Sequence, residues 1–154
     1  MPYLFSYGSN NITQLSTRIK RNILKSEIIP AYIEDYTRIF CFYSSKWNGS
    51  VASIYPDKHK LVFGTLIVLA ENELRKLDKL ETNYTRKMIR VNDNYFNKLN
   101  AHVYVCNDTT FVKEPSVEYI NNIKKNIYES WKIKTERVPI YIKTKKGIEL
   151  YKND

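Results

Sequence analysis

The chain is poor in the residue types that mark linkers, disulfide frameworks and metal centres. Its 154 residues include only four Gly, five Pro, two Cys and two His. So little Gly and Pro argues against flexible linkers and low-complexity segments, and no internal repeat is present. His59 and His102 stand alone, and no Cys/His spacing matches a zinc site. We therefore expect structural roles for both histidines and no metal site.

Long apolar runs are also missing. The longest, residues 61–70, is interrupted by Gly64 and Thr65 and is too short to cross a bilayer. The N-terminus has no charged segment followed by an apolar one, so it does not resemble a signal peptide. We therefore expect a cytoplasmic protein with no membrane partner. Cys41 and Cys106 fit buried strand thiols in a reducing compartment, although their spacing also leaves a disulfide open.

What the chain does contain is typical of a folded domain. Hydrophobic residues make up 43% and aromatic residues 14%, which excludes a disordered chain. The length suits a single domain over residues 1–154 with a proper core. The net charge of +9 raises the question of nucleic acid. Because the basic residues are spread along the chain, we expect a solvated basic face rather than a nucleic-acid site.

Strand-like and helix-like patterns are interspersed rather than alternating. The periodicities predict helices over residues 12–24, over residues 70–80 and from Ser116 onwards. They predict strands over residues 3–7, 31–43, 51–55, 61–69, 88–91 and 101–105. We expect Pro56 to end the strand over residues 51–55, and residues 61–69 to be buried on both faces. Residues 140–154 are expected to form a polar C-terminal tail, after a short edge strand at 139–142. The pattern favours an α+β domain built as a small mixed β-barrel with flanking helices.

The first predicted strand runs directly into a turn of small polar residues and then into a helix. That arrangement points backbone N–H groups into one cavity, where negative oxygen charge can sit. Gly8 allows close backbone approach or a positive φ, and Asn10 tolerates that region well. The same residues would also serve an ordinary helix cap, so the turn by itself does not decide between the two interpretations.

Glu81 ends the helical stripe that includes Leu74 and Leu77. A carboxylate at a helix C-terminus meets the negative end of the helix dipole, and apolar neighbours would desolvate it. Both effects raise the pKa of a carboxyl group, which suits an acid that exchanges protons near neutral pH. The alternative is a solvated Glu81 paired with Lys79 or Arg86, and the pattern leaves both open.

Five blocks of the sequence, in order, resemble the gamma-glutamylcyclotransferase family. The match as a whole spans residues 3–127. The five blocks are Tyr7-Gly8-Ser9-Asn10 with Arg18, Trp47 to Ile54, Phe63 to Leu66, Leu77 to Glu81 with Tyr84 and Arg86, and Pro115 to Tyr119. The chain departs from the family pattern at Asn11, Ser50 and Thr82. The form of the first block is nearest the members that act on gamma-glutamyl amino acids.

The resemblance implies a gamma-glutamylcyclotransferase-like fold and release of 5-oxoproline from a small gamma-glutamyl substrate, with no need for a metal or organic cofactor. Glu81 is then the general acid/base, and the backbone N–H groups of the turn hold substrate oxygen charge. The implied substrate-binding residues are Leu4, Phe5, Ser6, Tyr7, Gly8, Ser9, Asn10 and Tyr119. Two alternatives stay open, a related enzyme acting on gamma-glutamyl amines and a non-catalytic module that uses its basic surface. The sequence also leaves a homodimer open.

Overall fold

Five strands close into a barrel because β3 pairs on both sides. The computed structural model describes residues 2–153, so Asp154, the last residue of the expected tail, lies outside the described residues. The strands are β1 (Tyr3–Ser6), β2 (Ile28–Ser44), β3 (Gly49–Val68), β4 (Tyr84–Asp93), β5 (Lys98–Cys106), β6 (Pro139–Thr144) and β7 (Gly147–Asn153). The five barrel strands follow the order β3-β1-β5-β4-β2, and β2 pairs again with β3. The sheet continues from β2 to β6 and β7. β1 and β5 run parallel while the other barrel pairs are antiparallel, so the barrel is mixed, as predicted.

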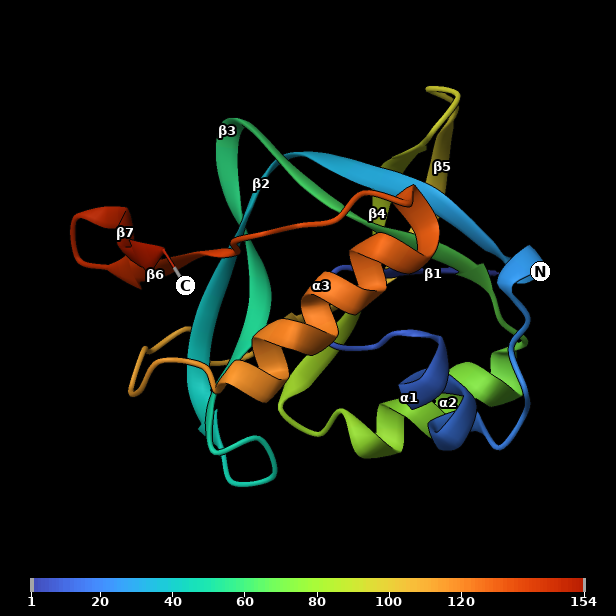
Figure 1. Ribbon diagram of the computed structural model, residues 1–154, viewed down its shortest axis with the longest axis horizontal. Helices are drawn as coiled ribbons and strands as arrows, with labels where there is room; N and C mark the ends of the chain where they lie inside the picture. The colour runs from blue at the N-terminus through green and yellow to red at the C-terminus, as the bar shows by residue number, and fades with distance from the viewer. Residues whose placement is uncertain (1, 154) are drawn as a thin grey trace.

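Three α-helices flank the barrel, which also agrees with the prediction (Figure 1). They are α1 (Ile12–Ile19), α2 (Glu71–Leu80) and α3 (Val117–Trp131), and a 3-10 turn covers Lys25–Glu27. α1 is shorter than expected because Lys20 adopts a left-handed conformation, with φ of 58°. α3 begins as predicted, since the Ser116 side chain accepts a hydrogen bond from the backbone N–H of Tyr119.

β2 and β3 form one long hairpin, so the prediction that Pro56 ends a strand is wrong. Pro56 lies opposite Tyr36, next to a break in register between Glu34 and Tyr36. Asp35, at that break, has φ of 64°. Because a bulge interrupts the hydrogen-bond ladder, proline is tolerated there and the strand continues past it.

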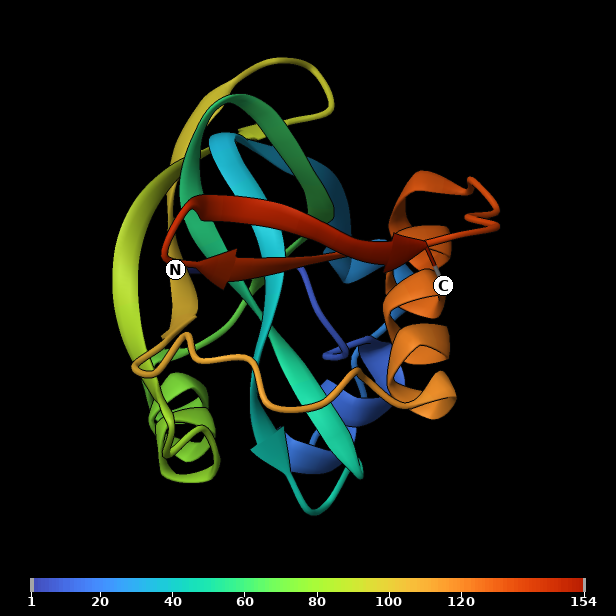
Figure 2. The same ribbon diagram turned by 90° about the vertical axis from the view of Figure 1, so that its left-hand side faces the viewer.

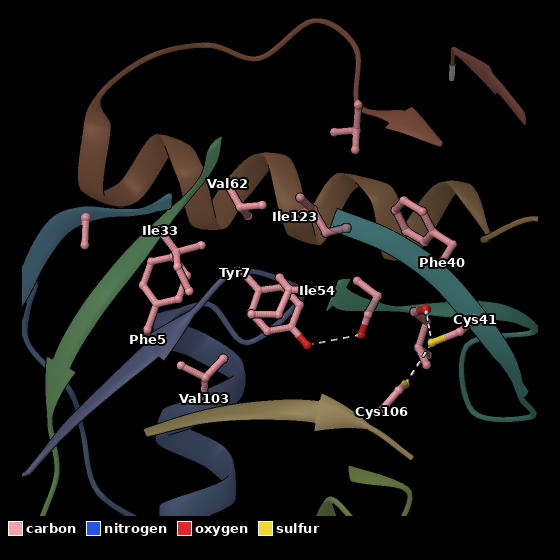
Figure 3. Close-up of a cluster of buried hydrophobic side chains, with 14 of the residues drawn as sticks. Phe5, Tyr7, Ile33, Phe40, Cys41, Ile54, Val62, Val103, Cys106 and Ile123 are labelled. Carbon is pink, nitrogen blue, oxygen red and sulfur yellow. Dashed lines mark hydrogen bonds between the residues drawn. The ribbon is translucent and has the colours of Figure 1, made fainter. Parts of the chain in front are cut away.

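Residues on alternate faces of β1 belong to two separate clusters. Phe5 and Tyr7 point into the barrel beneath α3, together with Ile33, Val62 and Ile123 (Figure 3). Leu4 faces the other way and packs with α1 and α2, where the buried partners include Leu15, Ile19, Leu74 and Leu77. The period of two along a strand explains this division. The expectation that residues 61–69 are buried on both faces is wrong at their start, because Leu61 and Phe63 are 51% and 44% exposed.

The C-terminal segment is a hairpin rather than the polar tail expected for residues 140–154. β6 pairs in parallel with β2, with Tyr141 opposite Ile39, and β7 returns antiparallel to β6 (Figure 2). Ile140 is buried, whereas all of β7 beyond Ile148 is exposed. β7 is short, largely polar and has no buried face, so its sequence predicts a tail rather than a strand.

The two cysteines meet inside the barrel. Cys41 on β2 and Cys106 on β5 are both buried free thiols, and their sulfur atoms are 2.8 Å apart. The prediction of buried strand thiols is therefore confirmed. Contact with Cys106 and burial both raise the pKa of the Cys41 thiol, so it stays protonated. Among residues 2–153, no helix has both the length and the apolar composition to cross a bilayer.

Gly64 allows β1 to lie close against β3. A Cβ at this position would lie 2.4 Å from the Ser6 carbonyl oxygen and 2.9 Å from the Phe5 ring. We predict that Gly64→Ala lowers the free energy of unfolding by about 1–3 kcal/mol, because neither backbone nor a buried ring can move freely. Denaturant unfolding followed by circular dichroism would measure the loss.

Gly8→Ala is the matched control for this substitution. A Cβ at Gly8 would meet its nearest atoms at 3.6 and 3.7 Å, which is ordinary contact. The stability of Gly8→Ala should therefore stay within about 0.5 kcal/mol of the parent chain. Equal stability of the two variants would contradict the account of close strand packing at Gly64.

Candidate active site

One pocket of about 240 Å³ brings together all nine residues that the sequence singled out. Its walls come from β1, the turn after β1, the β2–β3 connection, the C-terminal end of α2 and the start of α3. The nine are Leu4, Phe5, Ser6, Tyr7, Gly8, Ser9, Asn10, Glu81 and Tyr119. Segments that are far apart in sequence therefore meet in one cavity, while the roles expected for these residues stay predictions.

The turn between β1 and α1 is held by its own side chains. The Asn11 side chain accepts from the N–H of Gln14 at 3.0 Å and so caps α1. Its amide nitrogen donates to Asn122 on α3 at 2.8 Å. The Ser6 hydroxyl donates to the Asn10 carbonyl at 2.7 Å. Asn11 departs from the family pattern, yet these bonds give its buried side chain a full structural role.

Asn126 on α3 fixes the same turn from behind. Its amide nitrogen donates to the carbonyls of Ser6 at 3.1 Å and Gly8 at 3.3 Å, and its oxygen accepts from Thr65 at 3.2 Å. The side chain is almost fully buried. A buried amide with partners on both ends holds its neighbours in one geometry. The sequence analysis did not find Asn126, because it lies on a helix whose pattern indicates only an apolar seam.

These bonds occupy the carbonyl groups of the turn and leave its donors unused. Among the described residues, none accepts a hydrogen bond from the backbone N–H of Gly8, Ser9 or Asn10. Neither Gly8 nor Asn10 has a positive φ, so of the two possibilities given for Gly8 the close backbone approach is the one left. The value of Gly8 lies in its lack of a side chain beside the Tyr119 hydroxyl. Three backbone donors at one wall suit an oxygen that carries negative charge.

Glu81 caps the C-terminus of α2 and extends its side chain over the pocket. Its N–H donates to the Leu77 carbonyl at 2.8 Å, and its side chain is 12% exposed. Oε1 accepts from Arg18 Nη1 and lies 3.5 Å from Asn10 Nδ2. Among residues 2–153, no group donates a hydrogen bond to Oε2. One carboxylate oxygen is therefore fixed, and the other is left for a ligand.

The ion-pair partner of Glu81 differs from both partners that the sequence suggested. Arg86 instead contacts Glu71 and Asp78, each at 3.2 Å. Arg18 reaches Glu81 from the last turn of α1, which packs against α2. The expectation of Lys79 or Arg86 as partner rested on nearness in sequence, and packing between helices overrides it.

Two cations stand at the rim beside Glu81. Arg18 is 15% exposed, and Lys46 lies above the Trp47 ring, with Nζ 5.3 Å from its centre. Burial lowers the pKa of the Lys46 ammonium, and the charge of Arg18 lowers it further, while Glu81 acts in the opposite direction. The pocket thus offers positive charge for an acidic group next to a carboxylate for a basic one.

The backbone N–H and carbonyl of Ala52 hold two phenols at the base of the pocket. Its carbonyl accepts from Tyr84 at 2.8 Å, and its N–H donates to the Tyr119 oxygen at 2.8 Å. The Tyr7 hydroxyl donates to the carbonyl of Tyr104 at 2.6 Å. Burial raises the pKa of Tyr7, Tyr84 and Tyr119, so all three phenols stay neutral.

The two phenols expected to offer hydroxyls to a substrate therefore differ. The Tyr7 proton is committed to backbone within the barrel. The Tyr119 hydroxyl lies between β3 and the turn, where it also contacts the Ser9 side chain. Of the two, Tyr119 is the hydroxyl placed beside the unused N–H donors.

Several pocket residues lie outside the set that the sequence predicted. Arg18, Trp47 and Tyr84 stood within the matching blocks, so the resemblance could have indicated them. Lys46 lies in the β2–β3 connection, and nothing in the local pattern distinguishes it from other exposed lysines.

Comparisons with known proteins agree with this architecture. The family model described as "Gamma-glutamyl cyclotransferase, AIG2-like" matches residues 4–133. A search of the curated proteins found no match. A solved structure described as a gamma-glutamyl cyclotransferase is 20% identical, with a TM-score of 0.71, and the match covers 84% of this chain and 79% of that one.

Two further solved structures share the fold. One is an uncharacterized human protein, 21% identical with a TM-score of 0.68, covering 83% of this chain and 79% of its own. The other is a yeast gamma-glutamyl cyclotransferase specific to glutathione, 13% identical with a TM-score of 0.55, covering 81% and 86%. Identities this low show the fold alone, whereas the family model spans most of the chain. The chain belongs to the AIG2-like gamma-glutamyl cyclotransferase family.

Proposed function

We propose that the protein cyclises a gamma-glutamyl group to 5-oxoproline and releases the attached amino acid or amine. The observation that carries this proposal is the meeting of Glu81 and the β1–α1 turn in one pocket. Glu81 Oε1 and Asn10 Nδ2 are 3.5 Å apart although 71 residues separate them. A proton acceptor thus stands beside a group of backbone donors, which is what cyclisation of a gamma-glutamyl amide needs.

In the proposed reaction the α-amino nitrogen of the substrate attacks the γ-carbonyl carbon of the same glutamyl group. Glu81 takes a proton from the α-ammonium group, which frees the lone pair for attack. A C–N bond forms as the ring closes, and the γ-carbonyl oxygen becomes negative. The bond to the leaving nitrogen then breaks as that nitrogen receives the proton held by Glu81. The ring nitrogen gives up its second proton to Glu81, which passes it to the released amine, so that the products are 5-oxoproline and an ammonium group. The reaction is intramolecular, so holding the chain curled supplies much of the rate.

The pocket residues divide this work by charge. The unused Oε2 of Glu81 would accept the ammonium proton, while Arg18 keeps Oε1 in place. The N–H groups of Gly8, Ser9 and Asn10 would stabilise the oxygen that becomes negative. Positive charge from Lys46 at the rim would attract the substrate α-carboxylate.

The size of the pocket supports a small reacting group. A cavity of about 240 Å³ lies below the range usual for drug-sized ligands, so it suits a single gamma-glutamyl group. The leaving amino acid or amine would then extend toward the opening. Its identity is set outside the part of the pocket described above.

A 5-oxoproline release assay over gamma-glutamyl amino acids, gamma-glutamyl amines and glutathione would test the proposal. Turnover of gamma-glutamyl amino acids is the expected result, and exclusive turnover of amines would assign the related reaction instead. No release from any member of the panel, together with steep salt-dependent binding to nucleic acid, would favour a non-catalytic module.

Glu81→Gln is the sharpest test of the acid/base role. The amide keeps the shape of the side chain but cannot accept a proton, so we predict that kcat falls by at least about 100-fold. The variant should keep the parent thermal stability to within a few degrees, which would show that folding is intact. Steady-state 5-oxoproline release would measure the effect.

Glu71→Gln is the matched control. It makes the same substitution on α2, at a side chain that is 49% exposed and lies outside the pocket. Its kcat should stay within about twofold of the parent value, since exposed ion pairs contribute little. Parent-like turnover in Glu81→Gln would overturn the assignment of Glu81.

Gly8→Val tests the role of the turn. The nearest atoms to a Cβ at Gly8 are the Tyr119 hydroxyl at 3.6 Å and the Ala52 Cβ at 3.7 Å. Alanine therefore fits, whereas the two further methyl groups of valine would occupy the space beside the N–H donors. We predict that kcat/KM falls at least about tenfold in Gly8→Val and less than threefold in Gly8→Ala. Equal kcat/KM values in the two variants would argue against a substrate oxygen at this turn.

A further inference from the structure

A second cavity, of about 440 Å³, lies under the C-terminal end of α3 and shares no lining residue with the first. One side is formed by β2 and β3, and the other by the segment that follows α3. Figure 1 shows this segment crossing back over the hairpin of β2 and β3 on its way to β6. The proposed reaction makes no use of this cavity.

An aromatic wall lines one side of the second cavity. Phe63 and Trp131 meet edge to face, with ring centres 5.2 Å apart. The Trp131 indole nitrogen donates to the Gly64 carbonyl at 3.0 Å, which fixes the ring on β3. Ile133 lies at the same cavity and, like Phe63, is largely exposed. A preformed apolar surface left open to solvent suits a flat apolar ligand.

The polar groups of this cavity are mainly cationic. Arg38, Lys60 and Arg137 line it, and the only acidic lining residue is Asp57. Asp57 already accepts a hydrogen bond from Thr37 at 2.7 Å. Among the described residues, the three cations form no ion pair. Burial lowers the pKa of Arg38 to about 10, so its guanidinium is charged at neutral pH without a counter-ion.

We propose that the second cavity binds a small organic anion with a flat apolar body. Phe63 and Trp131 would contact the body, while Arg38, Lys60 and Arg137 would hold the carboxylate or phosphate. Arg38 is half-buried and has no ion-pair partner among the described residues, so an anion would compensate the partial loss of hydration of its guanidinium. An aromatic body over fixed rings adds apolar contact at little entropic cost.

The wall of this cavity includes residues beyond the family match. That match ends at residue 133, whereas Thr135, Arg137, Pro139 and Tyr141 all line the cavity. The C-terminal segment thus completes a site on a barrel that the family shares.

Arg38 also connects the second cavity to the first. Its Nε donates to the carbonyl of Tyr7 at 2.9 Å, and its Nη2 donates to the carbonyl of Phe63 at 3.0 Å. Tyr7 immediately precedes Gly8 in the β1–α1 turn, which would hold the substrate in the proposed reaction. An anion that draws the guanidinium toward the second cavity would weaken its bond to the Tyr7 carbonyl. Anion binding in the second cavity should therefore change the conformation of the β1–α1 turn.

The two tryptophans of the chain lie in different cavities and can report on them separately. Trp131 lines the second cavity. Trp47 lines the first, where its ring packs against the Tyr119 ring with the ring centres 5.1 Å apart. Because the chain has only these two, Trp47→Phe leaves Trp131 as the sole tryptophan, and Trp131→Phe leaves Trp47.

The test of the site uses Trp47→Phe protein and three probes. Phenyl phosphate carries both the apolar body and the charge, phenol only the body, and inorganic phosphate only the charge. We expect saturable change in Trp131 emission with phenyl phosphate, at an affinity at least about tenfold higher than for either other probe. Equal affinity for phenyl phosphate and inorganic phosphate would mean that only charge holds the probe and that the apolar wall contributes nothing, which would overturn the proposal.

Lys60→Gln and Lys58→Gln form the matched pair of variants. Both change an exposed lysine of β3 to a neutral residue, but only Lys60 lines the cavity. Lys60→Gln should weaken phenyl phosphate binding about tenfold, and Lys58→Gln less than twofold. The same effect in both variants would mean that general surface charge, rather than this cavity, holds the probe.

The link through Arg38 is tested in Trp131→Phe protein, where only Trp47 emits. Because Trp131 also lines the second cavity, the affinity of this variant for phenyl phosphate is first measured by equilibrium dialysis. Phenyl phosphate should then change Trp47 emission over the concentration range in which it fills the second cavity of the same variant. That response should move to about tenfold higher concentration when Lys60→Gln is added. A Trp47 response that Lys60→Gln leaves unchanged would mean that the probe enters the first pocket directly. No response at all would overturn the proposed coupling through Arg38. Neither readout needs turnover, so this test is independent of the proposed reaction.

Discussion

The position of β1 between β3 and β5 is the constraint on which the remainder of the structure depends. This four-residue strand pairs antiparallel with β3 and parallel with β5, and so completes the barrel. Its alternation sends Phe5 into the barrel and Leu4 toward the helices. A slip of one residue would exchange these two side chains and bring the wrong groups to the turn that follows. Gly64 makes the position attainable, because a side chain there would collide with β1.

Around that strand, the active-site pocket is assembled by contacts between distant segments. α1 begins directly after the turn, and its last turn carries Arg18 to the end of α2, where Glu81 stands. α3 crosses the same turn and holds two of its carbonyls through Asn126. The backbone carbonyls of Ser6 and Gly8 are thus bonded, while the N–H groups of Gly8, Ser9 and Asn10 have no acceptor among the described residues. These N–H groups are left for a ligand because the carbonyls are already bonded, which is a more specific reason than the flexibility of a glycine.

Local pattern was sufficient wherever one short segment determines the outcome. The start of α3 follows from Ser116, and the extent of α2 follows from the spacing of Leu74 and Leu77. Pattern failed where a distant segment decides. Pro56 looks like a strand end until the bulge at Asp35 on the partner strand is seen. β7 exists only because β6 is anchored on β2, and its own residues carry no trace of that pairing.

The same division applies to the candidate site. The nine predicted residues could be named from the sequence because the family pattern records them in short blocks. The partner of Glu81 could not, since it depends on how α1 packs on α2, and an ion pair with Arg18 replaces the apolar surroundings that the stripe suggested. This matters for the chemistry. A carboxylate held at one oxygen by a cation keeps a defined orientation, so its free oxygen can face a substrate ammonium group without losing its own position.

The long β2–β3 hairpin makes the two cavities mechanically related. Residues of β2 and β3 contribute to both, with Phe42 and Ala52 at the first and Arg38 and Phe63 at the second. The ladders of the barrel hold each strand on two sides, and a close-packed interior transmits strain between them. A side-chain bond that crosses between the cavities is a shorter route than the ladders. The bond from Arg38 to the Tyr7 carbonyl is of this kind, and it ends at the residue that precedes the β1–α1 turn.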